Sequence, residues 1–170
     1  MEDWNQILTQ HADAVWRTAY RLLGSRADAD DVMQDVFVEA VGISTATVVR
    51  NWAAMLRRLA TVRALDCLRR RIGHRQRASN QIEMGKLPST VQAPEAVLLQ
   101  GELSERLRWA INRLPQQHAQ AFCLKFIEEM RYEDIADQLL VSVNSVGVIL
   151  HRARERLREL LHDYAAEQKR

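Results

Sequence analysis

The chain has 170 residues, of which 47% are hydrophobic and 27% are charged. This length suits one ordinary domain or two small ones and excludes a large multidomain enzyme, while the composition excludes a disordered or low-complexity protein. Aromatic residues make up only 6%, whereas alanine, leucine, arginine and glutamine abound, so local preferences favour helix over sheet. We therefore expect an all-α protein.

The sequence carries no sign of export or metal binding. No apolar run approaches the roughly 20 residues needed to cross a bilayer, and the N-terminal stretch is polar and acidic. Cys67 and Cys123 are far apart and form neither a metal-type pair nor a disulfide framework, and the histidines are scattered without metal-ligand spacing. We expect a cytoplasmic protein with free thiols, no membrane insertion, no metal and no cofactor.

Residues 1–77 are predicted to form a first small helical domain, because apolar residues recur there at steps of three and four. A first helix ends at Gly24, and a second begins near Ala27 with acidic residues in its first turn, where they suit the helix dipole. A loop over 42–47, rich in Gly, Ser and Thr, precedes a third helix from about 50 to 72. The predicted core residues are Ile7, Val15, Ala19, Leu22, Leu23, Val32, Val36, Phe37, Ala40, Trp52, Leu56, Leu59, Leu65 and Leu68.

A flexible linker is predicted over 78–101, where Gly and Pro interrupt the pattern and no apolar stripe survives. A second helical domain is predicted over 102–170, with Pro115 opening one of its helices. A linker of about 23 residues reaches at most roughly 75 to 80 Å. Its average span in solution is about 26 Å, so the two domains could also pack together.

Charges of one sign collect in three stretches. Residues 28–39 contain five acids and no base, which indicates an acidic helix face. Residues 57–77 contain eight arginines against the single acid Asp66, and residues 152–158 contain four arginines and Glu155. Basic clusters of this kind are typical of surfaces that bind a polyanion, so the sequence suggests two separate nucleic-acid contacts.

Residues 132–160 carry the pattern of a helix-turn-helix. The apolar residues of a short helix are followed by an apolar turn residue, Val141, and by Ser142 as a plausible N-cap of a second helix. The alternative is a helical hairpin whose apolar stripe only forms a core. Arginines beside the exposed face favour the DNA-binding interpretation, since they could hold phosphates on either side of the groove. The stripe comprises Ile135, Ala136, Leu139, Val146, Ile149 or Leu150, Ala153 and Leu157.

Both halves together resemble an extracytoplasmic-function sigma factor, the minimal two-domain type (group 4) of the sigma-70 family. In the first half, RLLGSRADADDVMQDVFVEA is similar to the polymerase-binding helix of that family, and WAAMLRRLATVRALDCLRRR to its promoter-melting helix. In the second half, LPQQHAQAFCLKFIEEMRYEDIADQL and SVNSVGVILHRARERLREL are similar to its minus 35 reader. The resemblance implies a region 2 helical bundle joined by the linker to a region 4 helix-turn-helix.

The resemblance also implies partners and sites. The first domain would bind the clamp of core RNA polymerase and the melted minus 10 element. The second would bind the polymerase flap and duplex minus 35 DNA, and an anti-sigma protein would act as regulator. The family uses no cofactor and performs no chemistry itself. The implied polymerase-binding residues are Asp31, Val32, Gln34, Asp35 and Phe37; the minus 10 residues are Arg58, Arg63, Arg69, Arg70 and Arg71; the minus 35 residues are Ser142, Asn144, Ser145, Val148, His151, Arg152 and Arg154.

The chain departs from the family at three places. The loop over 42–47, where members capture a flipped base, has no charge and no aromatic ring. Residues 147–149 are Gly, Val and Ile where members commonly show two basic residues, and Leu140 replaces a frequent turn glycine. Two alternatives therefore stay open. One is a sigma-like adaptor that binds polymerase or an anti-sigma protein without reading DNA. The other is an autonomous helix-turn-helix repressor, which the acidic helix argues against.

Overall fold

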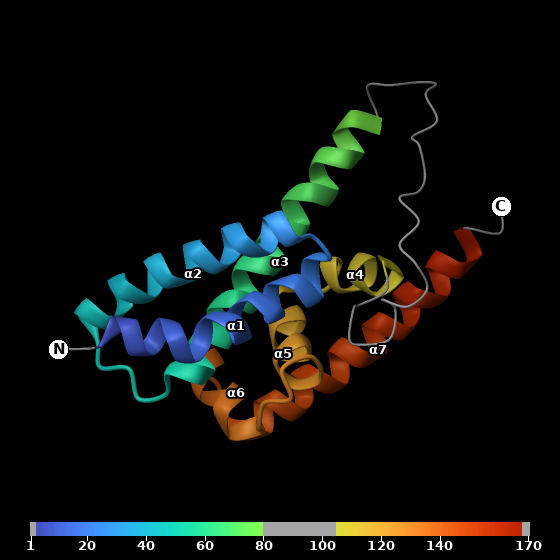
Figure 1. Ribbon diagram of the computed structural model, residues 1–170. Coiled ribbons are helices and arrows are strands. Elements are labelled where there is room, and N and C mark those ends of the chain that lie inside the picture. The colour runs from blue at the N-terminus through green and yellow to red at the C-terminus, as the bar shows by residue number, and fades with distance from the viewer. Residues whose placement is uncertain (1–2, 80–104, 168–170) are drawn as a thin grey trace, which may run out of the picture.

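The computed structural model describes residues 3–79 and 105–167, and every regular element in these ranges is an α-helix (Figure 1). The predicted all-α class is confirmed. The predicted linker lies outside the described residues from residue 80 onward, so the predicted domain boundaries stay predictions. The first half consists of α1 (Trp4–Leu23), α2 (Arg26–Ala46) and α3 (Trp52–Ser79), and the second half of α4 (Glu105–Asn112), α5 (Gln116–Phe126), α6 (Tyr132–Leu139) and α7 (Val143–Glu167).

The junction of α1 and α2 follows from local capping chemistry. Gly24 ends α1 in the left-handed conformation, with φ of +64°, and its N–H donates to the Tyr20 carbonyl at 2.7 Å. Glycine adopts this conformation without the steric cost that a side chain would add. Ser25 then caps α2 by accepting the N–H of Asp28 at 3.4 Å. The predicted end of the first helix is confirmed, and the second begins one residue before the predicted Ala27.

The predicted loop over 42–47 is wrong, because α2 continues through Ala46. The hydroxyls of Ser44 and Thr45 donate to the carbonyls three residues earlier, at 2.9 Å and 2.7 Å, so these polar side chains are satisfied within the helix. Ile43 packs against the main core. Tertiary packing of one apolar side chain thus outweighs the weak helix propensity of the residues around it.

The real connection to α3 is the shorter segment Thr47–Asn51, since α3 starts at Trp52. The Asn51 side chain accepts the N–H of Ala54 at 3.0 Å and caps the helix. This short segment exposes Val48 and Arg50 to solvent. The loop that the sequence predicts between the second and third helices is therefore formed by residues 47–51.

The helix α3 is shared by the two halves. It packs against α1 and α2 on one side and against α4, α5 and α6 on the other, and its last turns project from the body (Figure 1). The main hydrophobic cluster accordingly runs through both halves, since residues of α1 to α3 lie in it with Ile111, Leu114 and Leu157. The predicted residues of the first core are all buried except Trp52, which is partly buried against the same cluster.

The predicted helix-turn-helix forms in the second half. Pro115 directly precedes α5 as predicted, and α6 and α7 are joined by a tight turn. In this turn Leu140 adopts a left-handed conformation, with φ of +55°, and its side chain is 93% exposed, so no burial compensates the strain. The predicted apolar stripe of α6 and α7 is buried except Leu139, which is partly buried against it. The turn therefore keeps the shape that glycine usually provides, at a steric cost.

Replacing Leu140 with glycine is expected to stabilise the protein. The left-handed conformation costs a non-glycine residue roughly 1–2 kcal/mol, part of which is offset by the greater chain entropy of glycine when unfolded. Leu140→Gly should raise the free energy of unfolding by about 1 kcal/mol in a urea titration. Leu140→Ala is the matched control, because it trims the side chain but keeps the strain. Equal free energies for the two variants would contradict the role of the backbone conformation.

Candidate nucleic-acid and partner surfaces

The exposed face of α2 is acidic toward its start and apolar toward its end. Asp31, Gln34 and Asp35 are exposed, as a partner surface requires. Val32 and Phe37 are only 4% and 8% exposed, so these two predicted contact residues belong to the core beneath the face.

Two apolar residues on this face were missed by the sequence analysis. Val38 is 75% exposed and Val41 is 44% exposed. They follow Asp31 and Asp35 at helical steps, with Val38 seven residues after Asp31, so all four share one side of the helix. The helical repeat counted from the acids would have located them, whereas the search for apolar residues alone led to the core. We define the acidic-apolar face as Asp31, Gln34, Asp35, Val38 and Val41.

The arginines of α3 lie on different sides of the helix. Arg63 and Arg70 are seven residues apart and share one side, whereas Arg58 and Arg69 are eleven residues apart and share another. Arg71 points toward the first half. The sequence cluster is therefore divided by the helical repeat, and its members have different surroundings.

Contacts of these arginines differ accordingly. Arg70 is exposed, and Arg63 forms an ion pair with Glu39 on α2 at 2.8 Å. Arg71 binds the Asp28 carboxylate at 3.0 Å and the Leu23 carbonyl at 3.2 Å, which ties α3 to the end of α1.

The other two arginines face the second half. Arg69 donates to the carbonyl of Leu114 at 3.4 Å, and the Nε atom of Arg58 is buried without a hydrogen-bond partner. Of the predicted minus 10 arginines, Arg63 and Arg70 therefore share the side of α3 that carries the exposed Arg70, whereas Arg71 is bound to the first half and Arg69 to the second.

The exposed face of α7 carries a line of three side chains, Asn144, Val148 and His151. They lie one above another along the helix because they follow at steps of four and three residues. Glu155 continues this line, and its Oε1 atom lies 3.3 Å from the Nε2 atom of His151. Arg152 is exposed beside the line. The surface can therefore offer an amide, an apolar contact and an imidazole to the edges of bases.

Ser142 and Ser145, both predicted DNA contacts, are engaged in capping α7. The Ser142 hydroxyl accepts the backbone N–H of Ser145 at 3.1 Å and lies 2.8 Å from the Ser145 hydroxyl. Arg154, another predicted contact, lies over the ring of Phe126 with its guanidinium carbon 5.5 Å from the ring centre. Local contacts thus account for the positions of these three side chains.

Removing the cap should destabilise the helix-turn-helix. Ser142→Ala leaves the N–H of Ser145 without its acceptor and should lower the free energy of unfolding by about 1 kcal/mol. Ser142→Asp is the matched control, because aspartate caps helices as well as serine does, and it should keep the stability near that of the wild type. A urea titration of the three proteins measures both effects. An unchanged free energy for Ser142→Ala would show that the cap contributes nothing.

Within residues 3–79 and 105–167, no group of three or more His, Cys, Asp or Glu side chains is placed to hold a metal ion. Over the same ranges, no helix has both the length and the apolar character that crossing a membrane requires. Cys67 and Cys123 are free thiols, as the sequence predicts.

A helical body that carries a helix-turn-helix with an exposed, partly basic second helix defines the class of helix-turn-helix DNA-binding proteins. Comparison with known proteins narrows this class. Residues 7–72 match the family model described as Sigma-70 region 2, and residues 104–157 match that of Sigma-70, region 4.

Similar proteins carry sigma factor names. The chain is 32% identical over 167 residues to the ECF RNA polymerase sigma factor SigE of Mycolicibacterium smegmatis. The aligned region covers 98% of this chain and 65% of SigE. It is 31% identical over 135 residues to the RNA polymerase sigma factor YlaC of Bacillus subtilis, and this aligned region covers 77% of this chain and 76% of YlaC. The chain thus spans just under two thirds of the length of SigE.

A solved structure shows the same fold. The sigma factor RpoE of Bartonella quintana, crystallised in complex with the anti-sigma factor NepR, is 23% identical and has a TM-score of 0.57. The likeness covers 95% of this chain and 98% of that chain. The chain belongs to the extracytoplasmic-function RNA polymerase sigma factors. Members of this family are regulators of transcription that bind core RNA polymerase and promoter DNA.

Proposed function

We propose that this chain is a group 4 sigma factor of the cytoplasm that binds core RNA polymerase and directs it to promoters through separate minus 10 and minus 35 contacts. The observation that carries the proposal is the arrangement of the acidic-apolar face on α2, the side of α3 with Arg63 and Arg70, and the exposed line of Asn144, Val148 and His151 on α7. The chain itself supplies binding energy and position, while the polymerase performs the chemistry. A purified chain added to core polymerase should start transcripts at defined sites in a run-off assay.

The acidic-apolar face is proposed to bind the polymerase clamp. Its carboxylates would attract a basic partner surface and speed the encounter, since such charges steer association more than they tighten it. Val38 and Val41 would add the apolar contact that is desolvated when the complex forms. Val32 and Phe37 hold the helix in place from beneath.

Substitutions at neighbouring positions of α2 should separate binding from stability. Val38→Asp puts a charge at an exposed position and should weaken binding to core polymerase about tenfold or more, with the melting temperature almost unchanged. Phe37→Ala removes a buried ring and should lower the free energy of unfolding by about 3–5 kcal/mol. Binding is measured by titrating labelled chain with core polymerase. Full affinity of Val38→Asp would remove the apolar part of the proposed surface.

Minus 10 DNA is proposed to lie along the side of α3 that carries Arg63 and Arg70. Guanidinium groups spaced by two helical turns can follow a strand by charge. The segment Thr47–Asn51 is the proposed place for a flipped base, since it is the loop that precedes α3 and exposes Arg50. Arg58 and Arg69 would join these contacts only after the second half moves away from them.

Minus 35 DNA is proposed to be read by the line of Asn144, Val148 and His151. An asparagine amide pairs with adenine, and a valine methyl group contacts the methyl group of thymine. Arg152 would bind a phosphate beside the groove. Ser142 and Ser145 are proposed to approach the DNA as the capped start of the helix, whose N–H groups favour a phosphate.

Arg152→Ala should weaken DNA binding and make the affinity less dependent on salt concentration. Loss of one phosphate contact should lower affinity and reduce the slope of log K against log[salt] by about 0.9. Arg156→Ala is the matched control on the same helix, because the Arg156 guanidinium is already paired with Glu159 at 2.7 Å. Fluorescence anisotropy with duplex promoter DNA at several salt concentrations measures the slopes. Equal slopes for both variants would contradict a phosphate contact at Arg152.

A second candidate function is a sigma-like adaptor that binds polymerase or an anti-sigma protein without reading DNA. It is favoured by the exposed face of α7, where Gly147 and Val148 carry no charge and the acidic Glu155 continues the line of Asn144, Val148 and His151. An anti-sigma partner is proposed by analogy with the complex of RpoE and NepR. The run-off assay distinguishes the two functions. Binding to polymerase with no selected start site would support the adaptor.

A further inference from the structure

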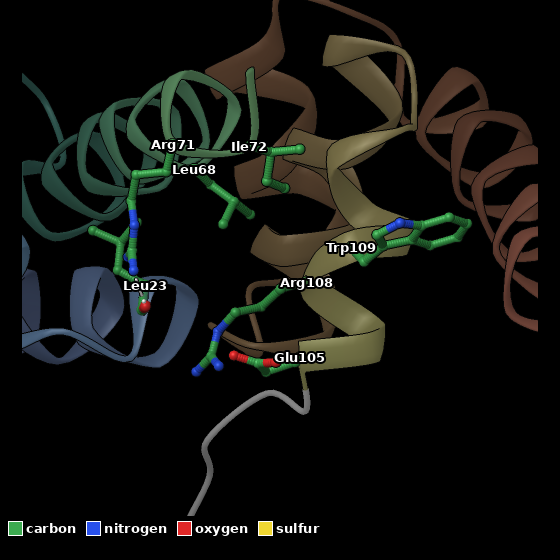
Figure 2. A pocket seen from close by; sticks show the side chains of 7 residues that line it. All are labelled: Leu23, Leu68, Arg71, Ile72, Glu105, Arg108 and Trp109. Atoms are coloured by element: carbon green, nitrogen blue, oxygen red, sulfur yellow. Dashed lines mark hydrogen bonds between the residues drawn. The ribbon is translucent and has the colours of Figure 1, made fainter. Parts of the chain in front are cut away.

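Charged side chains at the junction of the two halves are engaged with the chain itself. Figure 2 shows Arg108 extending from α4 toward the end of α1, where its Nε atom donates to the Leu22 carbonyl at 2.8 Å. Glu128 of the second half has a side chain only 6% exposed, and one of its carboxylate oxygens lies 3.8 Å from the Nη1 atom of Arg21 on α1. These groups belong to the packing of the fold. The exposed face of α7, by contrast, has room for another molecule.

Gly147 lies in the interior of α7, although neither its backbone nor its packing requires a glycine. Among the described glycines, only Gly24 has a positive φ, so other residues can adopt the backbone conformation at 147. Outside its chain neighbours and the backbone of α7, a Cβ atom there would meet only the Cε2 atom of Tyr132 within 4 Å, at 4.0 Å, which is an ordinary contact distance. Glycine is nevertheless a poor helix former compared with alanine. Position 147 therefore leaves open a space the size of a methyl group on the helix that is proposed to read DNA.

The residues around this space are apolar or aromatic. Val143 precedes Gly147 by one helical turn and His151 follows it by one turn, so the three lie in a row along α7. Val143 is 42% exposed, and His151 is also exposed. Tyr132 of α6 lies beside the row, and the Lys125 Nζ atom, 5.1 Å from the centre of the tyrosine ring, helps to hold the ring in place. We call the space at Gly147, with Val143, His151 and Tyr132 around it, the methyl site.

The charge around the methyl site matches the major groove of duplex DNA. Residues 138–150 contain no Lys, Arg, Asp or Glu, so the first two turns of α7 present no cation to a base. Cations lie at the margins instead: Arg131 directly precedes Tyr132 and has a side chain that is 77% exposed, and Arg152 is exposed one turn after Val148. In the duplex, uncharged base edges are flanked by phosphates in the same way. A contact of arginine or lysine with guanine, the commonest specific contact, is excluded for this part of the helix.

We propose that the methyl site receives the 5-methyl group of a thymine in duplex DNA, next to an adenine bonded by Asn144. Thymine is the base that presents a methyl group in the major groove, and an asparagine amide pairs with adenine. Asn144 lies three residues before Gly147, so its amide and the methyl site are neighbours on the helix surface. Burial of the methyl group against Val143 and Tyr132 removes apolar surface from water. The inference rests on the proposed minus 35 reading and specifies its sequence class, which is a step of adenine and thymine.

Replacing thymine with uracil tests the methyl site. Selection with the full chain, from duplexes that carry a randomised segment, first identifies a bound sequence. That duplex is then prepared with uracil in place of each thymine in turn, a change that removes only the methyl group. At the thymine of the methyl site, the change should weaken binding of the wild type about fourfold in fluorescence anisotropy, as expected for one buried methyl group. A selected sequence without thymine beside adenine, or equal affinity for thymine and uracil at every position, would overturn the proposal.

Gly147→Ala should remove the preference for thymine, because the alanine methyl group fills the space. At the thymine of the methyl site, the variant should bind the uracil duplex at least as tightly as the thymine duplex. Its melting temperature should rise by about 2–4 °C, since alanine favours the helix. Gly42→Ala on α2 is the matched control, because a Cβ atom there meets nothing within 4 Å, and it should keep the wild-type preference. A full preference for thymine in Gly147→Ala would overturn the proposal.

Val143→Thr tests the wall of the methyl site without changing Gly147. Threonine keeps the shape of valine and adds a hydroxyl, so the preference for thymine should fall while circular dichroism shows an intact fold. A thymine that lies against Val148 should keep its preference in this variant and in Gly147→Ala. An undiminished preference at the methyl site in Val143→Thr would contradict an apolar wall at this residue.

A run-off assay with core polymerase separates this inference from the proposed function. If uracil weakens binding but the chain neither binds polymerase nor starts transcripts, the proposed function fails and the methyl site stands. If the chain binds polymerase but enriches no duplex, the methyl site is overturned and the adaptor function is supported.

Discussion

The structure depends on one constraint, which is that α3 must satisfy two sets of neighbours at once. Leu56, Ala60, Ala64 and Leu68 lie in the cluster that runs through both halves, and Ala54 lies in the cluster of the helix-turn-helix. A helix buried on two sides has little surface left for function, so its exposed arginines are confined to the remaining strip. The same constraint explains why a cluster that looks uniform in sequence contains arginines with quite different surroundings.

Much of the fold could be predicted from the sequence because its signals are local. Gly24 and Ser25 specify a helix end and a helix start through the geometry of a few adjacent atoms, and Ser142 specifies another. The apolar repeat located the cores of both halves. The predicted loop at 42–47 failed because Ile43 is held in a helix by packing with residues distant in sequence, which no local signal records.

The surfaces were predicted less well, for a physical reason. An arginine favours an anionic or carbonyl partner and a phenylalanine an apolar one. Only the packing of the whole chain decides which partner Arg58, Arg69 and Phe37 each contact. Phe37 meets the core and Arg69 a carbonyl of the second half. Contacts between the halves, above all those of Glu128 and Arg108, join residues roughly a hundred positions apart in the chain. A periodic pattern contains no information about such pairs.

Polar chemistry at the junction distinguishes it from the cores on either side. Within a core, apolar side chains lose nothing by staying together, so there is no reason for it to open. A junction whose backbone carbonyls are bound by Arg108, and which buries an undersatisfied Glu128, has water as a real competitor for every polar atom. The Arg69 guanidinium likewise donates to the Leu114 carbonyl, so a residue with the chemistry to bind a phosphate is engaged by the protein's own backbone.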